Sequence, residues 1–315
     1  MTVNTPSAAK GKTAHIIVGP TAVGKTAAAI KLGIQLETEI LSADSRQCYK
    51  ELNIGVARPT HDELSQVKHH FIASFSIYDE VNAGVFETYG LQQLHNIFSL
   101  KDNAVVVGGT GLYIKALCEG IDALPQIDKA IRASIIQDYN QHGLAWLRAQ
   151  VKQKDSLFFD SGENQNPQRL MRALEVMLST GQSILKYQTG TRVERPFLIR
   201  KYGLDLPREE LYTRINNRVD QMMEAGLLHE AESVYNSYVL PSAVLPLTPP
   251  ALNTVGYAEL FNYFKGLQTL PVAINQIKQH TRNYAKRQLT WFRKDPAIEW
   301  MAPSAFTRRV EIFMD

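Results

Sequence analysis

The octapeptide GPTAVGKT at residues 19–26 constrains the fold of this chain more than any other feature of its sequence. It matches the pattern GxxxxGK[ST], and it lies between a short apolar run and a helical pattern, which is the context this motif requires. The glycines let the backbone fold around phosphate with its amides pointing inward, while Lys25 supplies a positive charge and Thr26 a hydroxyl ligand for Mg²⁺. The motif therefore predicts a loop that binds a di- or triphosphate through Gly19, Pro20, Thr21, Ala22, Val23, Gly24, Lys25 and Thr26.

Short runs of branched apolar residues indicate a parallel β-sheet around this loop. Three such runs, at residues 14–18, 39–43 and 104–107, are each followed by a glycine or an aspartate, which is typical of buried strands. A helical pattern follows the first of them. We therefore expect an α/β fold with a parallel sheet like that of P-loop NTPases.

Residues 121–200 carry helical patterns without a strand candidate before residue 197. We expect helices there at residues 127–140, 144–152 and 167–179. Later in the chain we expect a strand at residues 197–204 and helices at residues 208–225, 227–238 and 272–294. The pattern predicts an α/β core made of residues 1–120 and 201–315, with residues 121–200 inserted as a helical domain.

The composition is that of an ordinary globular protein. The 315 residues suffice for about two domains, and 44% apolar with 21% charged residues disfavours disordered and fibrous classes. No stretch approaches 18 consecutive apolar residues, so we expect a cytoplasmic protein without a membrane partner. The net charge is only +3, so a surface for nucleic acid has to be local. Cys48 and Cys118 lack the spacing of a metal or redox pair, and we expect both to be buried.

Asp44 is the candidate acidic residue of the site. It follows the second predicted strand, and ligands bind at the carboxyl ends of parallel strands, so we expect it to face the phosphate loop. An aspartate here also fits a turn or a helix cap. The strand that ends at Val107 is followed by GGTG instead of a second carboxylate, which favours a diphosphate ligand over a nucleoside triphosphate.

A basic segment near the C-terminus is the candidate surface for a nucleic acid backbone. Six basic residues and no acidic one lie between residues 278 and 294. Lys278, Arg282 and Lys286 follow i, i+4, i+8 spacing and share one helix face. A solvated helix face is the alternative.

Taken together, the chain resembles the bacterial tRNA dimethylallyltransferases over about residues 12–300. The motifs that carry the resemblance occur in the order of that family: GPTAVGKT, LSADSRQCYKELNIGVARPT, HHFI, VVVGGTGLY, NPQRLMRALEV, RINNRVDQMMEAGL, TVGYAEL and AKRQLTWFRKD. Several of them are long, so the match is more specific than the phosphate loop alone. It implies a P-loop enzyme that binds dimethylallyl diphosphate and prenylates the N6 amine of the adenosine 3′ to the anticodon.

The resemblance implies roles for individual residues. An aromatic amine is a weak nucleophile and diphosphate leaves with negative charge, so the site needs a proton acceptor and a cationic clamp. Asp44 fits the acceptor, Lys25, Mg²⁺ and Arg218 fit the clamp, and Thr110 is the third catalytic candidate. The implied tRNA contacts are Asp44, Ser45, Arg46, Gln47, Thr110, Arg132, Gln168, Arg169, Leu170, Met171, Arg172, Lys278, Arg282 and Lys286.

Other functions remain open at this stage. An adenylate isopentenyltransferase that acts on free AMP, ADP or ATP would need neither the insertion nor the basic face. A P-loop small-molecule kinase would turn over ATP, and a nucleotide-dependent RNA-binding module would bind RNA without prenyl transfer. No obligate protein partner is evident, and we expect a monomer.

Overall fold

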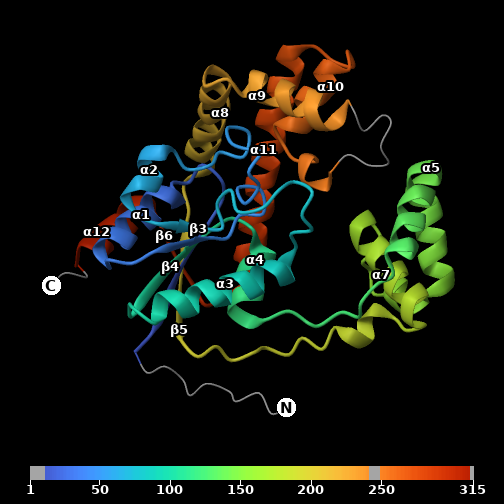
Figure 1. Ribbon diagram of the computed structural model, residues 1–315, viewed down its shortest axis with the longest axis horizontal. Coiled ribbons are helices and arrows are strands. Elements are labelled where there is room, and N and C mark those ends of the chain that lie inside the picture. The colour runs from blue at the N-terminus through green and yellow to red at the C-terminus, as the bar shows by residue number, and fades with distance from the viewer. Residues whose placement is uncertain (1–10, 241–248, 313–315) are drawn as a thin grey trace. The chain divides into compact units, whose positions relative to one another are not determined.

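The computed structural model describes residues 11–240 and 249–312 and divides the chain into two compact units (Figure 1). Unit 1 consists of the residues up to Glu119 together with those from Glu194 onward, and unit 2 consists of Gly120–Val193. Residues 194–200, which the sequence placed with the helical insertion, belong to unit 1 because strand β5 (Leu198–Leu204) already begins there.

A single parallel sheet organises unit 1. The strands lie in the order β3-β2-β4-β1-β5-β6. Their bounds are β1 (Thr13–Val18), β2 (Ile40–Ser42), β3 (His69–His70), β4 (Asn103–Val107), β5 (Leu198–Leu204) and β6 (Ile298–Met301). The predicted α/β class is confirmed, and the four predicted strands are present as β1, β2, β4 and β5. The edge strands β3 and β6 were not predicted.

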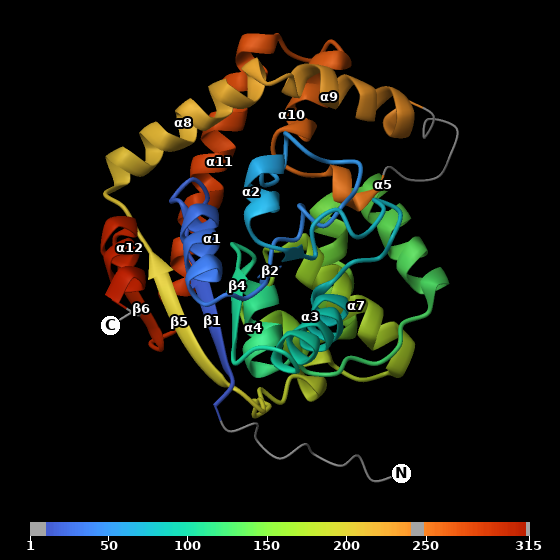
Figure 2. The same ribbon diagram turned by 60° about the vertical axis from the view of Figure 1, so that its left-hand side comes forward.

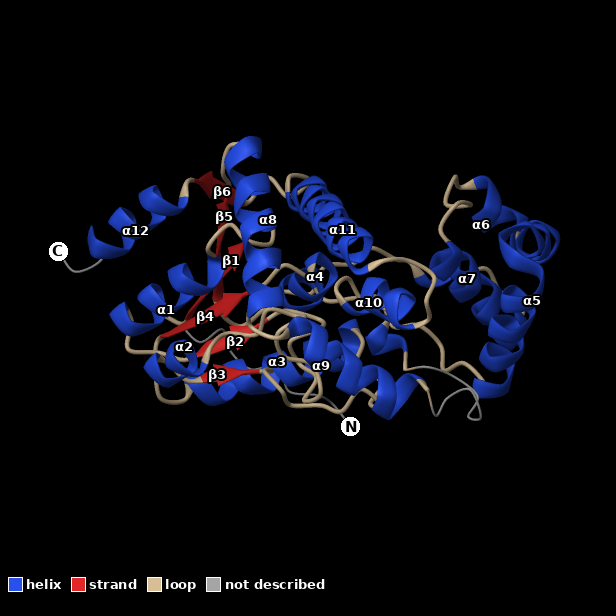
Figure 3. Ribbon diagram, turned by 90° about the horizontal axis from the view of Figure 1, so that it is seen from above, coloured by secondary structure: helices blue, strands red, loops and turns tan. Residues whose placement is uncertain are grey.

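Alternate side chains of each central strand enter two separate cores, one on each face of the sheet. In β1, Ile16 packs into one core and Ile17 into the other. Helices α1 (Lys25–Gln35) and α12 (Pro303–Ile312) cover one face, and α3 (Ala83–Phe98) and α4 (Gly111–Glu119) cover the other (Figure 3). The near-continuous apolar character of these strands follows from burial on both faces.

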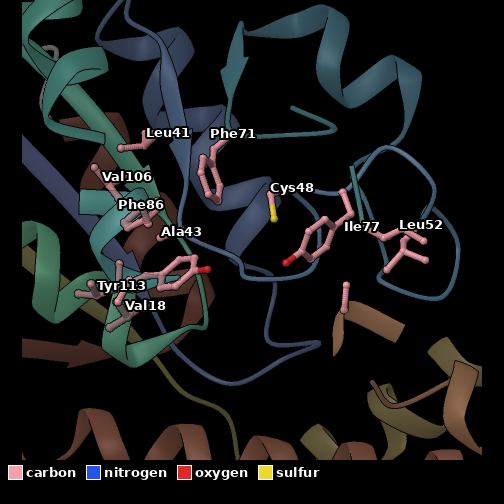
Figure 4. Close-up of a cluster of buried hydrophobic side chains, with 14 of the residues drawn as sticks. Val18, Leu41, Ala43, Cys48, Leu52, Phe71, Ile77, Phe86, Val106 and Tyr113 are labelled. Atoms are coloured by element: carbon pink, nitrogen blue, oxygen red, sulfur yellow. The ribbon is translucent and has the colours of Figure 1, made fainter. Parts of the chain in front are cut away.

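The core on the α3 and α4 side supports the loops that follow β2 and β4. Phe71 and Phe86 pack edge to face with ring centroids 5.0 Å apart, and Phe86 stacks on Tyr113 at 4.5 Å. Cys48 lies in the same cluster (Figure 4). Burial raises the pKa of the Cys48 thiol to about 12, which keeps it protonated. Both cysteines are free and buried, as predicted.

Four further helices of unit 1 pack together beyond the sheet (Figure 2). They are α8 (Arg208–Glu224), α9 (Leu227–Val234), α10 (Tyr257–Phe264) and α11 (Leu270–Phe292). Gly226, with φ of 101°, ends the α8 segment and caps α9, a left-handed conformation that glycine adopts without strain. The other helical segments that the structure describes in unit 1 are α2 (His61–Gln66), η2 (Tyr235–Val239) and η4 (Pro250–Leu252).

The regular elements described in unit 2 are all helical, and the unit has its own core. Its elements are α5 (Lys129–Lys154), α6 (Ser156–Asp160), α7 (Pro167–Thr180) and η1 (Ile184–Tyr187). Gly143, with φ of 73°, kinks α5 between the two helices that the sequence predicted there. Asn166 caps α7 by accepting the backbone N–H groups of Gln168 and Arg169, and Pro167 occupies the first turn.

Among the described residues, no helix combines the length and the apolar character needed to cross a bilayer.

Candidate functional site

A cavity of about 530 Å³ opens at the carboxyl ends of β1, β2 and β4. The loops that follow these three strands supply its floor, and α8 and α11 supply further walls. The cavity brings together residues from distant parts of unit 1: Thr21, Lys25, Thr26, Asp44, Gln47, Arg218, Tyr284 and Gln288. The predicted phosphate loop and the predicted acidic and cationic residues therefore share one site.

The phosphate loop takes its shape from two glycines. Gly19 has φ of 144°, and a Cβ atom there would lie 2.5 Å from the carbonyl oxygen of Leu204. Gly24 has φ of 102° and precedes the first residue of α1. Both conformations favour glycine, which explains the residue type at these two positions of the motif.

Lys25 is the most strongly perturbed cation of the site. Its Nζ atom donates to the carbonyl oxygen of Pro20 at 2.7 Å. Burial and, to a smaller extent, the positive charge of Arg218 lower the pKa of Lys25 to about 7, while Asp44 opposes the shift. A bound diphosphate would supply the negative charge that this buried ammonium lacks.

Asp44 is both a turn residue and a cavity residue. Its Oδ1 atom accepts the backbone N–H groups of Arg46 at 2.8 Å and Gln47 at 3.2 Å. Its side chain also lines the cavity that the phosphate loop lines. The two interpretations that the sequence left open for this residue are therefore compatible.

Thr110 connects the turn after β4 to the loop after β2 through hydrogen bonds. Its hydroxyl oxygen accepts the backbone N–H of Ser45 at 3.0 Å and lies 3.3 Å from the hydroxyl of that serine. The hydroxyl of Tyr284, on α11, is hydrogen-bonded to Thr110 as well. Burial raises the pKa of Tyr284 to about 12, with Asp44 adding to the shift, so the phenol stays protonated.

Gln288 is a site residue that the sequence did not reveal. Its Oε1 atom accepts the backbone N–H of Thr21 at 2.8 Å, and its Nε2 atom donates to the carbonyl oxygen of Gly109 at 2.9 Å. A Cβ atom at Gly109 would lie 2.0 Å from Nε2. One buried amide therefore connects α11 to the phosphate loop and to the GGTG turn. Its spacing of four residues from Tyr284, on the same helix face, is the only signal the sequence offers.

Arg218 enters the cavity from α8. Its Nη2 atom donates to the carbonyl oxygen of Ala57 at 3.4 Å. Burial lowers its pKa, while Asp44 and Glu63 favour its charged form. A guanidinium keeps its charge even in such surroundings, so Arg218 offers a permanent cation beside Lys25.

The loop between residues 47 and 58 is held by a carboxylate and a tyrosine from other elements. The carboxylate of Glu230 accepts the backbone N–H groups of Ile54 at 2.8 Å and Gly55 at 2.9 Å, and the hydroxyl of Tyr257 donates to it at 2.5 Å. A Cβ atom at Gly55 would lie 2.4 Å from the ring of Tyr257. These contacts join the loop after β2 to α9 and to the start of α10.

His69 lies in the wall of the cavity. Its Nδ1 atom lies 2.7 Å from the carbonyl oxygen of Val67, and its Nε2 atom is buried without a hydrogen-bond partner among the described residues. Burial lowers its pKa, so its ring is neutral near pH 7. His70 contacts Glu39 instead, at 2.6 Å.

The possible metal ligands in the cavity are few. Thr26, Asp44 and Glu63 line it, and the described part of the chain has no group of three or more His, Cys, Asp or Glu side chains that could hold a metal ion. Mg²⁺ is commonly bound by one or two protein oxygens together with the phosphates of a substrate. This donor set fits a Mg²⁺ ion that binds together with diphosphate.

The residues of unit 2 that the sequence assigned to tRNA divide into two groups. Arg132 and Arg172 both contact Glu175, at 3.7 and 3.0 Å, and Arg169 forms an ion pair with Glu163. Leu170 and Met171, in contrast, are buried in the core of the unit. These two side chains pack α7 against α5, and their contact with tRNA stays a prediction.

The predicted basic face of α11 is partly occupied by α8. Lys278 forms an ion pair with Asp220 at 2.6 Å, and Arg282 donates to Asn216 at 2.7 Å and lies over the ring of Tyr212. Lys286 is exposed. The three residues that share a helical spacing therefore differ in their surroundings.

Comparison with known proteins relates this chain to one family. A sequence model described as IPP transferase matches residues 47–295. The chain is 45% identical to the tRNA dimethylallyltransferase of Cytophaga hutchinsonii, over 93% of each chain. It is 42% identical to tRNA dimethylallyltransferase 1 of Bacteroides thetaiotaomicron, over 94% of this chain and 93% of that one. Its structure resembles the tRNA isopentenylpyrophosphate transferase of Bacillus halodurans with a TM-score of 0.68 and 30% identity, covering 97% and 96% of the two chains.

Proposed function

Because the chain belongs to the IPP transferase family, we propose that it transfers a dimethylallyl group from dimethylallyl diphosphate to the N6 amine of the adenosine 3′ to the anticodon of tRNA. The observation that carries the proposal is the cavity that joins the phosphate loop to Asp44 and Arg218. Such a site can hold a diphosphate at one end and a nucleophilic amine at the other.

The residues of the cavity divide the chemistry between them. The phosphate loop, Lys25 and Arg218 bind the diphosphate and neutralise the charge that grows on it as the bond from oxygen to the allylic carbon breaks. Thr26 would hold Mg²⁺, which supplies further positive charge to the leaving diphosphate when it is bound. Asp44 accepts the proton that N6 loses as the new carbon–nitrogen bond forms.

Thr110 and the residues around Asp44 orient the adenosine. Thr110 is held between Ser45 and Tyr284, so its hydroxyl has a fixed position beside Asp44. Ser45, Arg46 and Gln47 follow Asp44 in the same loop and contact the extruded nucleotide. Extrusion is required because the N6 amine is not accessible to a carboxylate inside the cavity while its base remains stacked.

Residues of both units bind the rest of the tRNA. Unit 2 contacts the anticodon stem-loop through Arg132, Gln168, Arg169 and Arg172, whose side chains present charge or amide groups. In unit 1, Lys278, Arg282 and Lys286 bind phosphates, for which Lys278 and Arg282 have to exchange their partners on α8. We further propose that the enzyme acts in the cytoplasm, where it would meet its tRNA substrate, and that it acts as a monomer, since one chain contains all the residues of this proposal.

A product assay tests the proposal. Labelled dimethylallyl diphosphate and Mg²⁺ are incubated with either unmodified tRNA or AMP, and the nucleosides are then analysed. We expect label on the adenosine 3′ to the anticodon and none on AMP, without consumption of ATP. Label on AMP alone would assign the chain to free adenylates, and a requirement for ATP hydrolysis would contradict the diphosphate site.

A further inference from the structure

A turn at residues 53–58, which we call the 53–58 turn, borders the cavity of the phosphate loop, the reaction cavity. Two hydrogen bonds close it: the N–H of Ala57 donates to the carbonyl oxygen of Ile54 at 2.9 Å, and that of Arg58 to Asn53 at 3.1 Å. Ala57 has φ of 49°, in the left-handed region that residues with a Cβ atom seldom adopt. Such a conformation persists only where the surrounding contacts hold it.

The carbonyl oxygen of Ala57 accepts two side-chain hydrogen bonds. Gln47 donates to it at 2.9 Å and Arg218 at 3.4 Å. In the part of the chain that the structure describes, this carbonyl is the only hydrogen-bond partner of the Arg218 guanidinium. The orientation of Arg218 in the free protein therefore depends on where the 53–58 turn places one oxygen atom.

Glu230 holds the other side of this turn. Its carboxylate accepts the backbone N–H groups of Ile54 at 2.8 Å and Gly55 at 2.9 Å, and the hydroxyl of Tyr257 donates to it at 2.5 Å. Hydrogen bonds to a charged acceptor are stronger than those to a neutral one. Tyr257 is fully buried and its ring fills the space beside Gly55, so the phenol holds the carboxylate against the turn.

Arg218 and Glu230 come from two consecutive helices of unit 1 (Figure 2). Arg218 lies on α8 and Glu230 on α9, with Gly226 between the helices, and the two helices contact each other. The 53–58 turn is therefore bound by the same pair of helices that carries the cation. A shift of the turn away from Glu230 would move the Ala57 carbonyl relative to Arg218.

We propose that Glu230 is a positioning residue for the diphosphate: it holds the 53–58 turn, and the Ala57 carbonyl of that turn orients the guanidinium of Arg218 in the reaction cavity. Among the described residues, Glu230 does not belong to those that line the cavity, so it acts through Arg218 and not on the substrate. The proposal rests on the proposed function, because it takes Arg218 as a residue that binds the diphosphate.

Binding of inorganic diphosphate to the full chain tests this role without RNA. Arg218→Ala should weaken binding roughly 10- to 150-fold, the range for loss of a hydrogen bond to a charged group. Glu230→Gln keeps the size of the side chain, but its NH₂ group faces a backbone N–H and cannot accept from it. This variant should weaken binding roughly 3- to 30-fold, a range typical of coupled residues in one network.

The sign of this effect separates positioning from charge. Removal of a negative charge by itself favours an anion, so a loss of affinity in Glu230→Gln is opposite to the pure charge effect. The matched control is Glu232→Gln, which removes the same charge at an exposed position of α9. Its affinity should equal that of wild type or slightly exceed it. Equal affinities of the two Gln variants would overturn the proposal.

A double-mutant cycle tests the route through Arg218. In an Arg218→Ala background, Glu230→Gln should weaken diphosphate binding less than about twofold, because the cation that it positions is absent. A purely structural role predicts the same loss in both backgrounds, and this result would refute the positioning of Arg218.

Tyr257→Phe is a milder second variant, which tests the proposal even where Glu230→Gln fails to fold. It keeps the ring beside Gly55 and removes only the phenol that holds the carboxylate. Diphosphate affinity should fall roughly two- to tenfold, and this loss should also vanish in the Arg218→Ala background. An affinity equal to that of wild type would contradict the role of the carboxylate.

Prenyl transfer separates this proposal from the proposed function. Single-turnover transfer to tRNA should fall roughly 10- to 100-fold in Glu230→Gln, because a displaced cation misplaces the diphosphate, while the affinity for tRNA stays near wild type. A wild-type enzyme that prenylates no tRNA would refute the proposed function, whereas the diphosphate titrations test Glu230 by themselves.

Discussion

At the scale of single residues, one oxygen of Asp44 holds a turn through the backbone N–H groups of Arg46 and Gln47, and this allows structure and chemistry to be separated. An asparagine Oδ1 atom can accept the same two hydrogen bonds but cannot take up a proton. Asp44→Asn should therefore lower kcat by about 10²–10⁴ while the melting temperature and the affinity for tRNA stay near wild type. Single-turnover rates measure the first effect, and a variant with wild-type turnover would exclude Asp44 as the base.

Lys25 makes the affinity for the diphosphate depend on pH. Its pKa is about 7 in the free protein, because burial disfavours the ammonium, and a bound diphosphate raises this pKa by adding negative charge. Below pH 7 the group is already charged, so binding takes up no proton there. Above pH 7 binding requires up to one proton, and Kd should rise up to about tenfold per pH unit until the pKa of the complex is reached.

Calorimetry in buffers of different ionisation enthalpy measures this proton uptake between pH 7.5 and 9. Lys25→Met is the matched control, since it keeps the length of the side chain but removes the charge. It should bind dimethylallyl diphosphate weakly and without proton uptake. A wild-type Kd that stays constant over this range would show that Lys25 does not contact the diphosphate.

At the scale of elements, Gln288 connects α11 to the phosphate loop. In the described structure it is the only residue of α11 with a hydrogen bond to Thr21 or Gly109. Gln288→Leu leaves the buried carbonyl of Gly109 and the partly buried N–H of Thr21 without this partner, and the buried carbonyl alone should cost about 1–3 kcal/mol of unfolding free energy. It should also weaken binding of dimethylallyl diphosphate, because the Thr21 amide loses its orientation. Gln279→Leu, at an exposed position of the same helix, should change neither property.

Urea unfolding and equilibrium binding provide the two measurements for this pair of variants. If Gln288→Leu matched the Gln279→Leu control in both, the amide would have no part in holding the loop.

Strands whose own residues explain their burial could be predicted from the sequence. Strands that form only beside a neighbouring strand could not. The strands β1 and β4 are buried on both faces and show it in their apolar runs. In contrast, β3 has two residues and pairs with β2, and β6 has four and pairs with β5. Such short edge strands exist because a neighbour offers hydrogen bonds, so their own sequence carries no period.

The site shows the same division between local and distant causes. The phosphate loop is a continuous motif, and Asp44 follows a recognisable strand, so both could be found from the sequence. Gln288 acts on Thr21 from 267 residues away, and the buried nitrogen of His69 is visible only once the cavity exists. Lys278 and Arg282 had the spacing of an exposed face, but their positive charge is met by polar groups of α8.

At the scale of the whole molecule, the residues of the proposed reaction and some of the residues proposed to bind tRNA belong to different units. The reaction cavity and the sheet below it lie in unit 1, and Gly120–Val193 form a unit with its own core. Arg195 donates to the carbonyl oxygens of Leu117 at 2.8 Å and Ala116 at 2.7 Å, so the chain leaves and re-enters unit 1 at neighbouring points. These hydrogen bonds therefore hold the two ends of unit 1 together without a contribution from unit 2.

This arrangement predicts the result of replacing Gly120–Val193 with a flexible linker of about ten Gly and Ser residues. The shortened protein should bind dimethylallyl diphosphate with an affinity near wild type, because the phosphate loop, Asp44 and Arg218 remain in place. It should lose most of its affinity for tRNA and most of its prenyl transfer, because Arg132, Gln168, Arg169 and Arg172 are removed. Binding titrations with each substrate measure both effects. Transfer to tRNA at the wild-type rate would show that unit 1 holds the whole RNA-binding surface, and transfer to AMP would show that unit 2 serves to exclude free nucleotides.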